Sequence, residues 1–128
     1  MFLNDLFYIE ELSYTGNRLE ANIRFNPGHR IFAGHFPGSP VVPGVCLLEV
    51  IKETLGQVVQ KELSLIAASS IKFLQMIDPT INTEVHLSGT FVQNQFGIIK
   101  AEISITAGKA VFLKMKASFD ISFTSLRN

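Results

Sequence analysis

Two stretches near the amino terminus are predicted to be strands, and the second alternates cleanly between apolar and polar residues, as a strand with one buried face does. They run from Phe7 to Tyr14 and from Arg18 to Phe25, and Leu19, Ala21, Ile23 and Phe25 share one face of the second. Between them, Thr15-Gly16-Asn17 favours a hairpin turn. The chain is therefore predicted to begin with a β-hairpin.

The pattern changes to a helical period between Val45 and Gln60, which has no Pro and one Gly. Apolar residues cover more than half of this helix's circumference, so we predict that it is largely buried. Its polar residues form one stripe at i, i+3 and i+4 spacing, made of Glu49, Lys52, Glu53, Gln57 and Gln60. A polar stripe on a buried helix must face water, a partner or a cavity.

A period of two returns after Ser64, with predicted strands over 65–77, 83–93 and 98–106. A last strand places Val111, Leu113, Met115, Ala117, Phe119, Ile121 and Phe123 on one face, and 124–128 is predicted to be a loose tail. One apolar helix among about six mainly antiparallel strands predicts an α+β fold in which the sheet wraps round the helix.

Composition narrows the class of protein. A length of 128 residues predicts one domain over 1–128, and a net charge of zero excludes the global basic field typical of nucleic-acid binding. Only 17% of residues are charged and 11 are Phe, so we expect some apolar surface to be buried against another subunit. With one cysteine, no signal-peptide pattern and no membrane-length apolar run, the chain is predicted to be cytoplasmic.

The segment from Asn26 to Glu49 holds most of the Pro and nearly half of the Gly around His35. Three prolines after His35 fix φ and favour extended neighbours, so the loop should hold the imidazole rigidly. Histidine is the usual general base near neutral pH. The alternative is a loop histidine that only binds a backbone carbonyl.

The helix after this loop supplies further candidate groups. Glu49 lies fourteen positions after His35, either as a carboxylate of the site or as part of a solvated polar face. The amides of Gly44 and Val45 begin the helix without intrahelical partners, and they suit an oxyanion; alternatively, Gly44 only avoids a clash. Cys46 reads as a packed thiol, and three scattered histidines predict no metal site.

The string Gly34-His35-Phe36-Pro37-Gly38-Ser39-Pro40-Val41-Val42-Pro43-Gly44-Val45, followed by Leu47-Leu48-Glu49, resembles the signature of the (3R)-hydroxyacyl acyl-carrier-protein dehydratases with the hot-dog fold. The resemblance implies edge-to-edge dimers, often trimers of dimers, in which His35 of one subunit meets Glu49 of the other. It also implies that His35 removes the α-proton, Glu49 protonates the leaving hydroxyl and Gly44 polarises the carbonyl. The resemblance further implies a substrate carried on the phosphopantetheine arm of acyl carrier protein, and we expect no metal or redox cofactor.

Other assignments follow from the same resemblance. Glu53 stands where the family usually has Gln, and a second carboxylate there would repel that of Glu49. Phe36 and Phe73 are candidates for lining the acyl tunnel, or else core residues. An acidic carrier protein could bind to basic residues, for which the candidates are Arg24, Arg30, Lys114 and Lys116. The alternative is that these four residues are ordinary exposed charges on the surface.

The predicted function is therefore a hydro-lyase that forms trans-2-enoyl thioesters in fatty-acid or related acyl and polyene biosynthesis. One alternative is a hot-dog thioesterase in which Glu49 activates water or attacks the thioester. The other is a non-catalytic partner that binds acyl carrier protein and keeps the loop for its structure.

Overall fold

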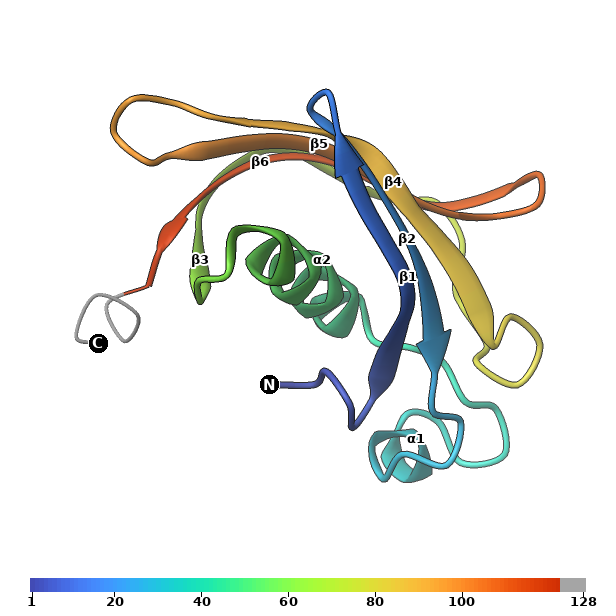
Figure 1. The fold of residues 1–128 in the computed structure, drawn as a ribbon. Coiled ribbons are helices and arrows are strands. Elements are labelled where there is room, and N and C mark those ends of the chain that lie inside the picture. The colour runs from blue at the N-terminus through green and yellow to red at the C-terminus, as the bar shows by residue number, and fades with distance from the viewer. Residues whose placement is uncertain (123–128) are drawn as a thin grey trace.

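The computed structural model describes residues 1–122, and the predicted sheet around one helix is confirmed. The elements are β1 (Phe7–Thr15), β2 (Arg18–Phe25), α1 (Ile31–Gly34), α2 (Gly44–Val59), β3 (Leu63–Phe73), β4 (Glu84–Gln93), β5 (Ile99–Ala107) and β6 (Ala110–Ile121). The strands form one sheet in the order β1-β2-β4-β5-β6-β3, and every pairing is antiparallel. The sheet curves over α2, while α1 lies beyond the end of β2 (Figure 1).

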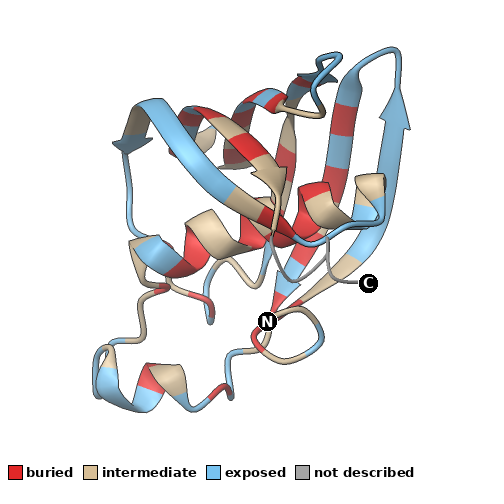
Figure 2. Cartoon of the chain, turned by 90° about the vertical axis from the view of Figure 1, so that its left-hand side faces the viewer, coloured by how far each residue is buried: buried red, intermediate tan, exposed pale blue. Residues whose placement is uncertain are grey.

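The core lies between α2 and the inner face of the sheet, and Figure 2 shows the buried residues gathered there. From α2, Val50, Ile51 and Leu55 are completely buried, and they join one apolar cluster with strand residues such as Leu19, Ile23, Leu87, Ile105 and Phe119. Each such side chain stabilises the fold by about 1.5–3 kcal/mol. The apolar face of α2 is therefore held firmly against the sheet. The polar stripe of α2 lies on the side of the helix that faces away from the sheet.

Three details of the fold correct the sequence prediction. The third strand ends at Phe73 and not at Ile77; the Leu74 amide still donates to the Phe112 carbonyl at 2.8 Å, and residues 74–77 then leave the sheet. A register shift between β5 and β6 buries Phe112 in place of the predicted Val111, which stays half-buried. The four-residue helix α1 was not predicted at all. Phe123 and the predicted tail lie outside the described residues.

The sheet has two edges, β1 and β3. Along β3 and the turn after it, large apolar side chains are exposed, namely Leu65, Ile66, Phe73, Leu74 and Met76. A long strand edge with apolar side chains is a ready surface for pairing with another chain. Over residues 1–122, no helix is long and apolar enough to cross a membrane.

Candidate active site

The loop that carries His35 is closed by a tight turn over residues 36–39. The Phe36 amide donates to the Ser39 carbonyl at 3.1 Å, and the Ser39 amide donates back to the Phe36 carbonyl at 2.9 Å. Pro37 and Gly38 occupy the middle of the turn, and Gly38 has a φ of +75°. Since glycine adopts a positive φ without a steric penalty, this sequence favours the observed turn.

His35 is fixed by the peptide groups of Val41. The Val41 amide donates to the His35 carbonyl at 2.9 Å, and His35 Nδ1 lies 3.1 Å from the Val41 carbonyl oxygen. A carbonyl only accepts, so Nδ1 carries the hydrogen and Nε2 keeps its lone pair. The carbonyl contact that the sequence left as an alternative is present, and it leaves Nε2 able to accept a proton.

The candidate oxyanion donors lie at the start of α2. None of the described residues accepts a hydrogen bond from the amides of Gly44 or Val45, whereas those of Cys46 and Leu47 donate to the Pro43 carbonyl. The free amides point out of the positive end of the helix, where a developing negative charge is stabilised. The structure thus supplies donors of the kind that an enolate or oxyanion requires.

The two candidate tunnel residues both lie next to these groups. The Phe36 ring stacks on the His35 imidazole with centroids 4.1 Å apart, and 49% of Phe36 is exposed. Phe73 is 53% exposed, and a Cβ on Gly44 would lie 3.0 Å from its ring. Within this chain neither phenylalanine is a core residue. The lack of a side chain at Gly44 is what allows the Phe73 ring to approach the backbone so closely.

Glu49 lines a cavity of about 630 Å³ on the polar side of α2. Met1, Lys52, Glu53, Gly56 and Gln57 also line it, together with the segment 60–63 that leads into β3. Glu49 Oε1 lies 3.0 Å from Lys52 Nζ. His35 is not among the residues that line this cavity, and none of the contacts described for His35 involves Glu49.

Cys46 is buried in the core, close enough to Glu49 to feel its charge. Burial raises the pKa of its thiol, and the nearby charge of Glu49 raises it further. The thiol therefore stays protonated near neutral pH, as expected for a packing residue and not for a nucleophile. In the described part of the chain, no three His, Cys, Asp or Glu side chains are grouped so that they could hold a metal ion.

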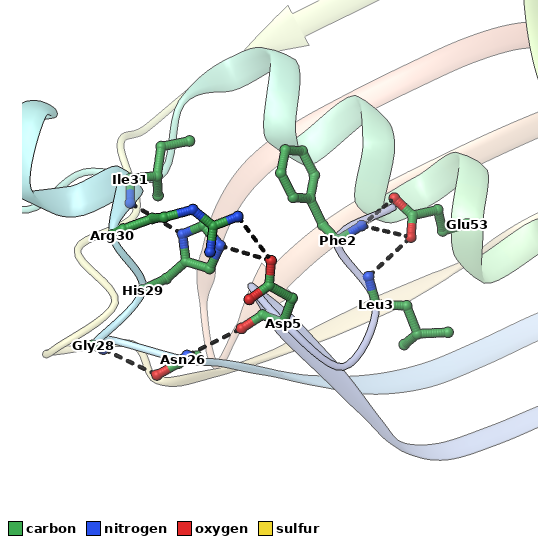
Figure 3. Close-up of polar contacts among 9 residues, drawn as sticks. All are labelled: Phe2, Leu3, Asp5, Asn26, Gly28, His29, Arg30, Ile31 and Glu53. Carbon is green, nitrogen blue, oxygen red and sulfur yellow. Dashed lines mark hydrogen bonds and ion pairs between the residues drawn. The ribbon is translucent and has the colours of Figure 1, made fainter.

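Glu53 belongs to the polar stripe of α2 and would be expected to face solvent, but it is buried. It is only 5% exposed, and its carboxylate accepts hydrogen bonds from the amides of Phe2 and Leu3 (Figure 3). Its partners lie fifty positions away, so no local pattern in the sequence could have indicated this contact.

Three of the four basic residues considered for carrier-protein binding make ion pairs within the chain. Arg24 pairs with Glu10, Arg30 lies 3.4 Å from Asp5, and Lys116 lies 3.8 Å from Glu102. Lys114 is exposed on β6. Exposed ion pairs contribute about 0–1 kcal/mol, so these contacts do not prevent the side chains from binding a partner.

Comparisons with known proteins agree with the architecture. The ApeI-like family model, described as ApeI dehydratase, matches residues 11–111. A 3-hydroxyacyl-(acyl-carrier-protein) dehydratase FabZ from Ligilactobacillus salivarius is 28% identical over 109 residues, covering 80% of this chain and 77% of that protein. The FabZ of Clostridium acetobutylicum is 30% identical over 97 residues, and the match covers 70% of this chain and 67% of the Clostridium protein.

Solved structures show the same fold at low identity. The dehydratase heterocomplex ApeI:P from Xenorhabdus doucetiae matches with a TM-score of 0.67 and 14% identity, covering 88% of this chain and 96% of the other. A thioesterase from Haemophilus influenzae matches with a TM-score of 0.59 and 12% identity, covering 93% and 80%. These matches confirm the predicted hot-dog fold.

Proposed function

This chain belongs to the ApeI dehydratase family, and on that premise we propose that it removes water from (3R)-hydroxyacyl groups carried by acyl carrier protein. The observation that carries the proposal is the fixed tautomer of His35, whose Nδ1 contacts the Val41 carbonyl and whose Nε2 is left as a base. The product is a trans-2-enoyl thioester, formed in fatty-acid or related acyl biosynthesis.

Each step of the reaction has a candidate group. His35 Nε2 takes the proton from the carbon next to the thioester carbonyl, and the released electron pair forms the new double bond. Glu49, in its protonated form, gives its proton to the β-hydroxyl as the carbon–oxygen bond breaks, so that water leaves. After the reaction His35 carries the α-proton and Glu49 is a carboxylate. Exchange of protons with solvent returns both groups to their starting forms.

The amides of Gly44 and Val45 donate hydrogen bonds to the carbonyl oxygen of the thioester in this proposal. Charge accumulates there as the α-proton leaves, and a fixed backbone donor at such a position is worth about 3–4 kcal/mol. The phosphopantetheine arm of the carrier protein holds the substrate. The reaction then balances with these groups alone, without a metal or redox cofactor.

Because His35 does not line the cavity of Glu49, a site completed by a second copy of the chain would bring the two groups together. We propose a homodimer in which β3 pairs with β3 of the second copy, with assembly into trimers of dimers as the larger form. The exposed apolar residues Leu65 and Ile66 on this edge strand would then be buried.

The direct test is turnover of a 3-hydroxyacyl thioester on acyl carrier protein. His35→Ala and Glu49→Gln should each lower the rate by about 10²- to 10⁴-fold, the usual contribution of a general acid or base. Glu20→Gln, at an exposed position of β2, serves as the control. Circular dichroism checks that each variant folds.

Two signals separate the alternatives. Appearance of conjugated enoyl absorbance supports the dehydratase, whereas release of free thiol identifies a thioesterase. Binding of the acylated carrier without either signal identifies a non-catalytic partner. Near-normal rates in either the His35 or the Glu49 variant would contradict the proposed mechanism.

A further inference from the structure

Glu53 is a buried carboxylate that is held only by backbone amides. The Phe2 amide lies 3.0 Å from each of its oxygens, and the Leu3 amide lies 2.9 Å from Oε1. Within residues 1–122, no Lys, Arg or His forms an ion pair with it. Burying a carboxylate costs free energy unless it is fully hydrogen-bonded. The amides of the amino-terminal segment therefore stabilise the buried carboxylate of Glu53.

This contact lies one helical turn from Glu49. Residues at i and i+4 share one face of a helix, and Glu49, Glu53 and Met1 all line the cavity of about 630 Å³. Met1 therefore forms part of the wall of the cavity that contains the candidate acid. A movement of the amino-terminal segment that shifts Met1 or Glu53 would change the surroundings of Glu49.

The same segment is bound at its other end to the loop before His35 (Figure 3). His29 is 6% exposed; its Nδ1 accepts a hydrogen bond from the Ile31 amide at 3.0 Å, so Nε2 carries the hydrogen and donates to Asp5 Oδ2 at 3.1 Å. Asn26 Nδ2 donates to the Asp5 carbonyl at 3.0 Å. The ring of Phe2 meets the His29 ring edge-on, with centroids 6.3 Å apart.

His29 in turn contacts the start of α1. Ile31 is the first residue of that helix, which ends at Gly34, the residue before His35. A continuous series of contacts therefore runs from Glu53 on α2, through Phe2, Leu3 and Asp5, to His29 and the base of the His35 loop.

From this connection we infer that residues 1–5 are a positioning element of the active site, with Glu53 as its anchor. The segment fixes the loop that carries the base relative to the helix that carries the acid. Glu53 acts here through other residues and does not touch substrate. The expected change in turnover rests on the proposed dehydratase function. The expected change in hydrogen exchange does not depend on that function.

The test uses Glu53→Gln in the full-length protein. An amide offers one acceptor oxygen, and its NH₂ group would face the donating backbone amides, so glutamine cannot accept all three bonds. Hydrogen exchange should show lost protection at residues 2–6 and, as the decisive result, at residues 29–41. Glu102→Gln, far from these contacts, should change neither segment.

Kinetics provide the second measurement. Displacement of a catalytic group by a fraction of an ångström lowers turnover more than binding, so Glu53→Gln should lower kcat by about tenfold and change KM by less than about threefold. Asp5→Ala removes the side-chain part of the same connection, the contacts of Asp5 Oδ2 with His29 and Arg30, at a half-buried position. If both act through the segment, the double variant should lose little more than either single variant.

The outcomes separate the inference from the proposed function. If the wild-type protein dehydrates no 3-hydroxyacyl thioester, the proposed function fails, and exchange at 29–41 still decides the inference. If residues 2–6 lose protection while 29–41 keep it, the inference is wrong. Should Glu53→Gln fail to fold, Asp5→Ala gives the same readout from the opposite end, and unchanged exchange at 29–41 in that variant also overturns it.

Discussion

The His35 loop and the polar face of α2 hold their functional groups in opposite ways. In the loop, the imidazole is fixed by Val41, six residues away, and the turn over 36–39 binds only itself. On α2, Glu53 depends on amides fifty positions earlier, and the cavity of Glu49 is lined by helix residues between 49 and 57, by the segment 60–63 and by Met1. The turn that carries the base is thus held by local contacts, whereas the polar face of the helix depends on residues distant in the sequence.

This difference determines how each half should respond to change. Disturbing the core under α2 should act on the stability of the whole fold, because the helix is packed against the sheet. Disturbing the largely exposed loop should act on the reaction and leave global stability nearly intact, since few buried contacts depend on it.

The largest effect on stability is expected from Ile51→Ala, at a completely buried position of α2. Such a truncation costs about 2–5 kcal/mol of unfolding free energy. Phe36→Ala is the matched change in the loop and should cost less than about 0.5 kcal/mol, because the ring is half exposed. Urea unfolding measures both, and equal losses would remove the contrast between the two regions.

An intermediate effect is expected from Gly38→Ala, where φ is +75° and no atom within 4 Å obstructs a Cβ. Only the backbone conformation opposes alanine, at about 1–2 kcal/mol. The exposed turn should rearrange to relieve this strain, so turnover should fall while the midpoint of unfolding changes little. Gly34→Ala is the control, since Gly34 also has open space but no positive φ. An unchanged rate in Gly38→Ala would show that the turn does not place His35.

The smallest effect concerns acid stability. The hydrogen bond from His29 lowers the pKa of Asp5 from 3.8, and Arg30 contributes in the same direction. A lowered folded-state pKa stabilises the fold above the unfolded value and loses this contribution as pH falls through the folded value. Asp5→Asn should therefore show a shallower loss of stability between about pH 5 and pH 2, measured by urea unfolding. An identical acid slope in both proteins would contradict this.

The same contrast explains what the sequence could predict. Alternation and helical periodicity located β1, β2, β4, β5, β6 and α2 to within about a residue or two, because one buried face imposes the period along each element. The motif around His35 predicted the loop because its determinants, Pro37, Gly38 and Val41, are neighbours in the chain.

What the sequence did not reveal depends on distant contacts. Glu53 follows the polar stripe in its spacing, yet its burial is set by Phe2 and Leu3. β3 ends at Phe73 although the apolar residues continue to Ile77, and the burial of Phe112 accompanies a register shift between β5 and β6. A local pattern carries no information about such partners.

The attachment of His35 to the peptide groups of Val41, and not to a side chain, has a consequence for how the protein can change over generations. Any residue except proline has the same amide and carbonyl, so substitutions at position 41 leave both contacts with His35 available. Natural selection can therefore alter the loop's outer surface to suit a new acyl chain or partner while the base keeps its place. The conserved quantity would be a backbone path, which a comparison of side chains alone would overlook.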